Sequence, residues 1–243
     1  MTPLPLFYPA PLTQGTLIRR YKRFLADVLV DGQELTVHCA NTGAMRGLIS
    51  PDAPVLLSYN PSPSRTYPYG LEAIQVQGTW VGTNTAMPNT LVALGLENGF
   101  FPEFQAYTSW KREVPYDDGK SRIDFLLTGD GLAPYYLEVK NVHDRVGTTA
   151  CFPDCPTVRG TKHMGALSRQ IAQGYRAAVL YLVQRDDTED FDLDAATDPL
   201  YSQAAQDAFQ AGVVPLVYQA RLSETSITLQ RLLPFRSRSR EGT

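Results

Sequence analysis

The chain has 243 residues, of which 43% are hydrophobic and 19% are charged, a composition typical of a globular protein long enough to bury a substantial core. Apolar runs stay below the roughly 18 residues of a membrane span, and the N-terminus lacks a signal-peptide pattern. We therefore expect a cytoplasmic protein with no membrane partner. The net charge of −3 argues against strong nucleic-acid binding by the whole surface and leaves local basic patches as the alternative.

The N-terminal third of the chain predicts a small β-barrel. Residues 1–14 contain four prolines and predict an extended arm. Short β-prone runs separated by Gly and Pro follow, at 16–30, 34–39, 55–59, 71–76 and 79–82. Five such runs predict a small barrel of the oligonucleotide-binding (OB) kind within residues 1–84.

Basic and aromatic side chains alternate in two parts of this predicted barrel. In a nucleic-acid-binding barrel, such rings stack on bases while the cations contact phosphates. The alternative is that Tyr21 and Phe24 belong to the core and the cations form a solvated edge. The candidate nucleic-acid-binding residues are Arg20, Tyr21, Lys22, Arg23 and Arg65.

A second domain is predicted after a connector at 85–107, whose residues 88–98 favour a helix. Within 108–243, predicted strands at 107–114, 121–128, 134–142, 177–183 and 213–218 are interspersed with helices at 161–173 and 199–211. This order predicts an α/β sandwich with a mixed sheet, and hence an α+β fold for the whole chain. The last eight residues are predicted to be a disordered tail.

The most informative stretch is a predicted β-hairpin around the turn 129–133. Pairing that is symmetric about Gly131 sets Asp124 opposite Glu138, and the strand period of two places Lys140 on the same face as Glu138. A shift of one residue would separate the two carboxylates, so this arrangement requires an odd-length loop or a bulge. Four hydrophobic residues are then expected to point the other way: Ile123, Phe125, Leu137 and Val139.

Two carboxylates beside an ammonium group suit metal-dependent phosphate chemistry. Asp124 and Glu138 are candidate ligands of Mg²⁺ or Mn²⁺, and Lys140 is a candidate for orienting water or stabilising charge on phosphorus. Glu113, on the preceding strand, is a further candidate for the metal shell or for a simple ion pair. The alternative is that the trio forms a surface ion pair that contributes roughly 0 to 1 kcal/mol.

The next predicted helix begins with groups suited to phosphate. Helix N-termini favour anions, so Arg159 and Lys162 are candidate nucleic-acid contacts. His163 is a candidate for the same role and is equally well explained as a hydrogen-bonding histidine. Motifs of P-loop nucleotide hydrolases, serine hydrolases and Rossmann dehydrogenases do not occur in the sequence.

With these stretches assembled, the chain resembles the sugar fermentation stimulation protein A family over nearly its whole length. The resemblance is carried by residues 17–28, 38–45, 121–125, 138–142 and 152–163. It implies an N-terminal OB-like barrel and a C-terminal domain similar to the restriction-endonuclease-like PD-(D/E)xK nucleases. It also implies DNA binding with a link to the regulation of sugar (maltose) metabolism, whereas nuclease activity follows only from the implied fold.

The resemblance maps residue by residue onto the hairpin. Asp124 matches the metal-binding Asp of the nuclease motif, and Glu138 with Lys140 matches its (D/E)xK pair. One position departs from the family pattern, because the linking helix carries Leu94 where an acidic residue is expected. Glu97, Glu103 and Glu113 are candidates to replace that missing carboxylate.

Three functions therefore stay open at this point. The first is a Mg²⁺- or Mn²⁺-dependent phosphodiesterase acting on DNA or RNA. The second is a DNA-binding, regulatory protein with an inactive nuclease fold, and the third is a module that binds a small anionic ligand. The sequence leaves the oligomeric state open, a homodimer included.

Overall fold

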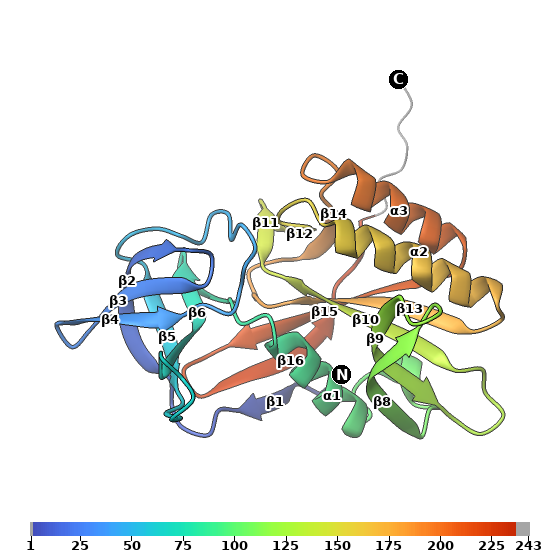
Figure 1. The fold of residues 1–243 in the computed structure, drawn as a ribbon, viewed down its shortest axis with the longest axis horizontal. Helices are drawn as coiled ribbons and strands as arrows, with labels where there is room; N and C mark the ends of the chain where they lie inside the picture. Colours follow the sequence, from blue (N-terminus) through green and yellow to red (C-terminus); the bar gives the residue numbers. More distant parts are fainter. Residues whose placement is uncertain (1, 237–243) are drawn as a thin grey trace.

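The computed structural model describes residues 2–236, which form a β-barrel beside an α/β domain (Figure 1). The α+β fold predicted from the sequence is confirmed, with an N-terminal barrel and a C-terminal mixed sheet flanked by helices. None of the helices within residues 2–236 is both long enough and apolar enough to cross a membrane.

The barrel is built from five strands that close on themselves. Its strand order is β4-β3-β2-β5-β6, and the parallel pairing of His38 on β4 with Gly70 on β6 closes the ring. Strand β7 extends the sheet beyond β6. The strands are β2 (Thr13–Tyr21), β3 (Leu25–Val30), β4 (Gln33–His38), β5 (Pro54–Tyr59), β6 (Tyr69–Val76) and β7 (Thr79–Gly82).

The run at 16–30, expected as one element, is two strands joined by a tight turn. Lys22 and Arg23 adopt φ values of 50° and 64°, in the left-handed region that turns the chain back on itself. Neither residue is the Asn or Gly that usually marks such a turn, which explains why the sequence pattern missed it. The apolar side chains of β2 and β3, among them Leu17, Ala26 and Val28, fill the barrel core.

The C-terminal domain is organised around a seven-stranded sheet with the order β1-β16-β15-β13-β10-β9-β8. The central strand β13 is parallel to β10 and β15, and the outer pairs are antiparallel, so the predicted mixed sheet is confirmed. The strands are β1 (Leu4–Phe7), β8 (Ser109–Tyr116), β9 (Ser121–Thr128), β10 (Tyr135–Val142), β13 (Arg176–Val183), β15 (Val214–Leu222) and β16 (Ser226–Leu232).

Strand β1 crosses from the barrel side of the chain to the edge of this sheet. The predicted boundary at residue 84 assigns β1 to the barrel, whereas Leu4–Phe7 pair with β16. Leu4 and Leu6 pack against the core of the C-terminal domain, and burial of these side chains explains the pairing. The first strand of the chain therefore ties its N-terminus to the C-terminal domain.

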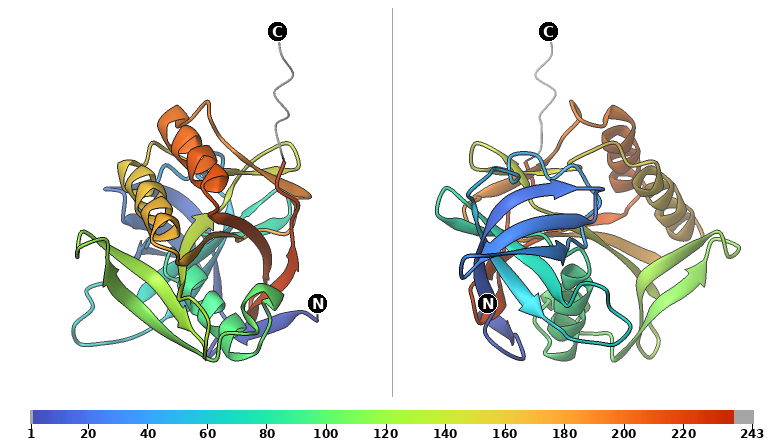
Figure 2. Two further views of the ribbon diagram at one scale, coloured as in Figure 1. Left: turned by 90° about the vertical axis from the view of Figure 1, so that its right-hand side faces the viewer. Right: turned by 60° about the vertical axis from the view of Figure 1, so that its left-hand side comes forward.

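Helices cover both faces of the sheet (Figure 2). On one face, α2 (Val158–Ala172) and α3 (Pro199–Gln210) pack through Met164, Leu167 and Ala205 against the sheet. On the other face, α1 (Met87–Glu97) and the 3₁₀ turn η1 (Pro102–Phe104) pack with Leu137 and Leu180. Alternate side chains of β10 and β13 are thus buried under the helices on opposite faces of the sheet. Because both faces of β13 are covered, its sequence is one continuous apolar run.

A small second sheet joins the two domains. It contains β11 (Asp144–Val146), β12 (Thr149–Phe152) and β14 (Asp190–Leu193). In the loop after β12, Asp154 lies 3.3 Å from His143 Nε2 and accepts a hydrogen bond from the backbone N–H of Met45 in the barrel. These contacts and the Gly82 N–H bond to the Gln184 carbonyl fix the barrel against the C-terminal domain.

The predicted disordered tail lies almost entirely outside the described residues, since only Arg236 of it is described.

Candidate functional site

The β9–β10 hairpin has the register expected from its sequence. Leu127 pairs with Tyr135 and Phe125 pairs with Leu137, so the pairing is symmetric about Gly131 across an odd-length connection. The next step of this register sets Asp124 opposite Glu138. At that position the regular strand pairing of β9 with β10 has ended, and Asp124 Oδ2 instead accepts a 2.7 Å hydrogen bond from the Val139 backbone N–H.

The opposite face of the hairpin differs from the prediction at one residue. Phe125, Leu137 and Val139 share one core cluster, whereas Ile123 packs in the cluster on the α2 side of the sheet. The expectation that Ile123 joins the other three is therefore wrong. Glu113, which the β8–β9 register sets opposite Asp124, has a φ of 53° between the pairs Arg112–Phe125 and Val114–Ile123.

Glu138 lies at the centre of a buried polar cluster. Its Oε1 is 2.6 Å from Lys140 Nζ and accepts a short hydrogen bond from His163 Nδ1 on α2. The other ring nitrogen of His163, Nε2, is 3.4 Å from Arg159 Nε. His163 Nδ1 is also 3.3 Å from Lys140 Nζ, and with its proton on Nδ1 the ring donates to Glu138 while Nε2 accepts from Arg159.

One oxygen of this cluster is left without a partner. Glu138 is 3% exposed, and its Oε2 makes no hydrogen bond to any of the described residues. A buried carboxylate oxygen without a donor is costly, so such an atom indicates a site for a cation or another ligand.

The pKa values of the two carboxylates shift in opposite directions. Burial, together with the neighbouring charge of Glu138, raises the pKa of Asp124 to about 6. Burial by itself also raises the pKa of Glu138, but Lys140 and His163 outweigh it and the net direction is downward. Near neutral pH both carboxylates are therefore largely ionised.

These side chains line a cleft of about 350 Å³. Asn89 of α1 is on one side of the cleft, Arg159, Gly160 and His163 of α2 are on another, and the exposed Glu113 contributes to its wall. The cleft thus brings together Glu113, Asp124, Glu138 and Lys140, all of the residues predicted for catalysis.

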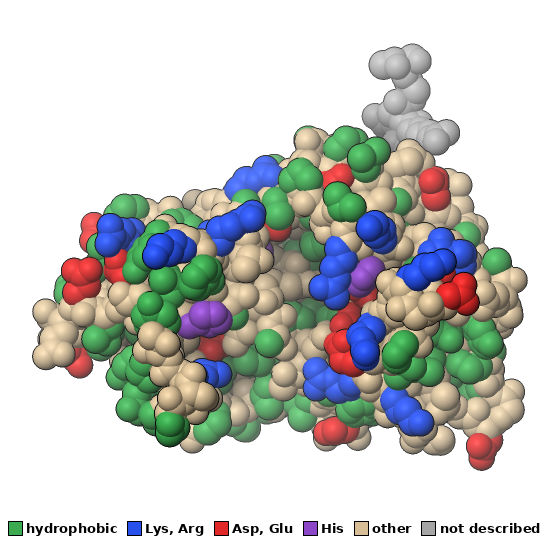
Figure 3. All heavy atoms as spheres, viewed as in Figure 1, with side chains coloured by type: hydrophobic (Ala, Val, Ile, Leu, Met, Phe, Trp, Pro, Cys, Tyr) green, Lys and Arg blue, Asp and Glu red, His purple; other side chains and the backbone are tan. Residues whose placement is uncertain are grey.

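A second, adjoining depression of about 630 Å³ shares Arg159 and His163 with the cleft and adds Lys120, Arg122 and Lys162. Figure 3 shows the face that carries these residues, where basic side chains surround the acidic groups of the C-terminal domain. An acidic centre with a basic rim is an arrangement that suits a polyanion whose phosphate is held next to a cation.

The linking helix presents an amide to the site, not a carboxylate. Asn89 Nδ2 donates a 2.9 Å hydrogen bond to Asp124 Oδ1, a role that no sequence pattern indicated. Of the predicted substitutes for the acid missing at Leu94, Glu103 accepts from the Tyr218 hydroxyl and Glu97 is exposed at the helix end. Only Glu113 lines the cleft.

The residues present fit a hard divalent cation. Within residues 2–236, no group of three or more His, Cys, Asp or Glu side chains is arranged to hold a metal ion. Mg²⁺, however, usually takes one or two carboxylates and completes its shell with water and substrate oxygens. Asp124 and the unpartnered Glu138 Oε2 supply those two carboxylates.

The predicted nucleic-acid-binding residues of the barrel fall into two groups. The Arg20 guanidinium donates to the carbonyls of Arg23, Asn41 and Gly43, so it holds the loops together. Tyr21 is likewise occupied, donating its hydroxyl proton to Asp27. Lys22 and Arg23 occupy the β2–β3 turn, and Arg65 lines a separate pocket of the barrel.

Two family models match the chain. One described as "SfsA N-terminal OB domain" matches residues 18–83, and one described as "Sugar fermentation stimulation protein RE domain" matches residues 86–226. A sugar fermentation stimulation protein homolog of Synechococcus sp. (strain JA-2-3B'a(2-13)) is 48% identical over 226 residues, which cover 93% of each chain. The homolog of Rhodospirillum centenum is 46% identical over 228 residues, covering 93% of this chain and 97% of the relative.

A solved structure shares the fold. The structure of Pyrococcus furiosus SfsA in complex with Ca²⁺ matches with a TM-score of 0.88 at 23% identity, covering 98% of this chain and all of the other. The barrel followed by a sheet with helices on both faces is therefore a fold found in a solved protein.

Proposed function

Because the chain belongs to the sugar fermentation stimulation protein A (SfsA) family, with an OB domain and a restriction-endonuclease-like domain, we propose that it binds nucleic acid and hydrolyses phosphodiester bonds with a divalent metal ion. DNA is the proposed substrate and Mg²⁺ or Mn²⁺ the proposed ion. The observation that carries the proposal is the buried, unpartnered Oε2 of Glu138 in a cleft shared with Asp124 and Lys140.

Two further observations support a metal site. Asp124 and Glu138 offer oxygen ligands of the kind that hard divalent cations prefer. The Pyrococcus furiosus protein of the same fold was solved with Ca²⁺, a cation with the same preference for oxygen. The chemistry that a bound ion supplies is polarisation of the scissile phosphate and of an attacking water.

Lys140 is proposed to stabilise the charge that develops on phosphorus. Its ammonium group has three donors; Glu138 Oε1 at 2.6 Å takes one of them, and His163 Nδ1 lies 3.3 Å from the same nitrogen. The remaining donors are available to phosphate oxygens in the cleft, where the side chain is largely shielded from water. A fixed cation in such a site acts most strongly on the transition state, where the negative charge is greatest.

His163 and Arg159 are proposed to position the acid. The contact of His163 with Glu138 Oε1 leaves Oε2 as the free oxygen, and Arg159 near His163 Nε2 favours the tautomer that donates to Glu138. Arg159 and Lys162 are exposed in the first turns of α2, where phosphates of the flanking nucleotides are favoured by charge and by the helix N-terminus.

The test combines metal binding with cleavage. Mn²⁺ or Mg²⁺ is expected to raise the melting temperature of the wild type and to leave that of Asp124→Asn unchanged, because only the native site binds the ion. With a labelled oligonucleotide and either metal, Lys140→Ala is expected to lower the cleavage rate by about 100-fold or more. Lys111→Ala, an exposed lysine on β8, is the matched control. An absence of both stabilisation and cleavage with either metal would overturn the proposal.

A second candidate, nucleic-acid binding without cleavage, is favoured by Asn89. This amide faces Asp124 from the linking helix, where the family resemblance implies an acid on the same helix. A protein that regulates sugar metabolism by binding DNA would need affinity for DNA and no cleavage activity. The same assays separate the two functions, since this one requires salt-dependent DNA binding that persists in EDTA with no cleavage product.

A further inference from the structure

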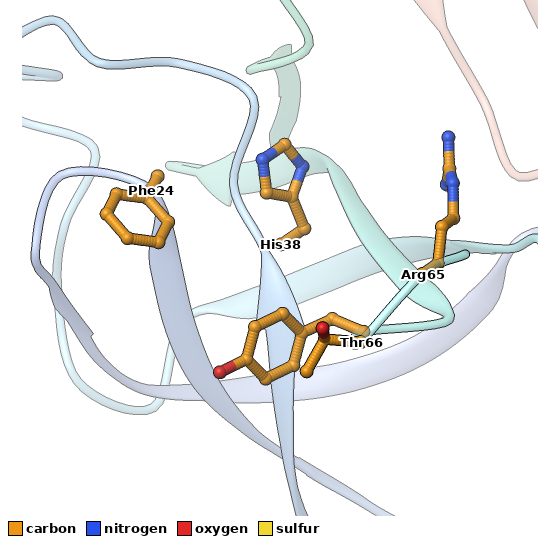
Figure 4. A pocket seen from close by; sticks show the side chains of 5 residues that line it. Phe24, His38, Arg65 and Thr66 are labelled. Carbon is orange, nitrogen blue, oxygen red and sulfur yellow. The ribbon is translucent and has the colours of Figure 1, made fainter. Parts of the chain in front are cut away.

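The barrel carries a pocket that the proposed catalytic site does not use. It has a volume of about 400 Å³ and is lined by Phe24, His38, Arg65, Thr66 and Tyr67. These residues come from three segments: the β2–β3 turn, the end of β4 and the β5–β6 loop (Figure 4). The volume is within the range of about 300 to 1,000 Å³ typical of small-ligand sites.

Both loops that form this pocket are fixed by hydrogen bonds. The carbonyl of Phe24 accepts from the Cys39 backbone N–H at 2.8 Å, and the Arg20 guanidinium holds the preceding carbonyl of Arg23. The β5–β6 loop is closed by a 2.8 Å bond from Asn60 N–H to the Pro68 carbonyl. Contacts of this kind hold the loop backbones in place before any ligand arrives, which lowers the ordering cost of binding.

The lining combines π faces with positive charge. Phe24 is 44% exposed, although a phenyl ring of its size is normally buried, and Tyr67 and His38 add two more rings. Arg65 adds a guanidinium, Lys22 and Arg23 precede Phe24 in its turn, and none of the five lining residues is acidic. Flat rings beside cations match a base joined to a phosphate.

We propose that this pocket binds an unpaired base of a single-stranded polynucleotide, with Arg65 contacting an adjoining phosphate. In a duplex, both faces of an internal base are covered by its neighbours, so the rings of the pocket have no surface to stack on. The site therefore selects a single strand, or a single-stranded end, over an intact duplex.

A short series of contacts links the pocket to the cleft of the C-terminal domain. His38 lines the pocket, and the carbonyl of Ala40, two residues on and within about 7 Å along the chain, accepts a 2.9 Å hydrogen bond from Thr85 Oγ1. Thr85 lines the cleft that holds Asp124 and Glu138. On the face in Figure 3, basic side chains border the hollow between the two domains on both sides.

This juxtaposition gives the pocket a role in substrate choice, and that part of the inference rests on the proposed function. A strand anchored by a base in the barrel pocket runs on toward the carboxylates of the cleft. The substrate class is then a polynucleotide with an unpaired segment, and the pocket sets where along that segment the cleft acts.

Binding is tested in EDTA, where no metal-dependent cleavage occurs. The anisotropy of a labelled oligodeoxynucleotide is compared with that of an oligoribonucleotide and of an intact duplex of the same sequence. We expect the wild type to bind single strands more tightly than the duplex, and Phe24→Ala and Tyr67→Ala each to weaken single-strand binding by about 5- to 100-fold. The ratio of the DNA and RNA affinities identifies the natural strand.

Matched variants separate stacking from folding. Phe7→Ala removes a phenylalanine that is 70% exposed on β1, outside the pocket, and is expected to bind like the wild type. Phe24→Trp keeps an aromatic face and is expected to restore the affinity. Because Phe24 is partly exposed, its truncation is expected to leave the melting temperature nearly unchanged.

Two results would overturn the inference: unchanged single-strand affinity in Phe24→Ala and Tyr67→Ala, or a duplex that binds as tightly as the single strand. Asp124→Asn distinguishes this failure from that of the proposed function. The variant is expected to bind single strands normally and to cleave nothing, so loss of cleavage alone leaves the pocket intact as a binding site.

Discussion

Asn89 of α1 donates a hydrogen bond of 2.9 Å to Oδ1 of Asp124 on β9, which joins the helix between the two domains to the acidic centre of the cleft. The same carboxylate accepts from the Val139 backbone N–H through Oδ2. Asp124 is thus held in one orientation by the linking helix and by the facing strand, before any cation binds.

Replacing Asn89 with Asp is expected to strengthen metal binding and to weaken the metal-free protein. A third carboxylate within hydrogen-bond distance of Asp124 adds a hard oxygen ligand, and without a cation it adds like-charge repulsion. We expect Mn²⁺ to bind about tenfold more tightly by titration calorimetry and the melting temperature in EDTA to fall. Asn89→Leu, which removes the amide without adding charge, is the control. A metal affinity equal to that of the wild type would show that position 89 does not face the ion.

The raised pKa of Asp124 predicts a pH dependence of the metal-free protein. Its usual pKa is 3.8, and burial together with the charge of Glu138 raises it to about 6 in the folded state. Between about pH 4 and pH 6 the folded protein therefore holds a proton that the unfolded chain has released. The stabilisation that this proton gives the folded state is complete below pH 4 and is lost as the pH rises through 6. Its size is at most about 2 to 3 kcal/mol.

The comparison that isolates this contribution is wild type against Asp124→Asn in EDTA, because the other titrating groups are shared. We expect the variant to be the more stable of the two at pH 8, and its advantage to shrink as the pH falls to 5. The free energy of unfolding from urea titrations at each pH measures this. A stability difference that does not change between pH 5 and 8 would mean that Asp124 has an ordinary pKa.

The sequence predicted those parts of the site that depend on strand periodicity. The odd-length loop around Gly131 and the alternation of side chains sufficed to bring Asp124, Glu138 and Lys140 together. Asn89 was missed because its role depends on how α1 packs across the sheet, which no local pattern specifies. The structural contacts of Arg20 were missed for a related reason, since a guanidinium that bonds three loop carbonyls looks, in sequence, like one that contacts phosphates.

The same distinction applies to the fold. The longer elements were predicted, among them the three α-helices within residues 2–236, because apolar stripes and helix stop signals such as Asn98-Gly99 are local properties. The short strands β11, β12 and β14 were missed, since each has only three or four residues and owes its pairing to tertiary contacts. The seven-residue β16 was missed as well, although its alternating burial is a strand pattern.

Two helical glycines are expected to respond in opposite ways to alanine. At Gly95 of α1, an added Cβ would overlap the buried Phe101 ring, lying 2.7 Å from its Cζ, so Gly95→Ala is expected to destabilise the protein by about 1 to 3 kcal/mol. At Gly165 of α2, the nearest atom is the flexible end of Arg169 at 3.4 Å, so alanine is expected to be neutral or stabilising by up to about 1 kcal/mol. Urea unfolding of the pair measures both, and equal effects would contradict the packing of α1 on Phe101.

The salt dependence of DNA binding is expected to separate phosphate contacts from structural arginines. Arg159 and Lys162 are exposed on the rim of the cleft, so replacing either with Ala is expected to reduce the slope of log K against log salt by about 1.

Arg20→Ala is expected to keep the slope and to lower stability by about 1 to 3 kcal/mol, because three loop carbonyls lose their donor. The control is Arg221→Ala, which removes an exposed arginine of β15 that pairs with Asp186; it should change neither quantity appreciably. Anisotropy titrations at several salt concentrations give the slopes. A reduced slope in Arg20→Ala with unchanged stability would instead make Arg20 a phosphate contact, as its place beside Tyr21 and Lys22 in the sequence predicts.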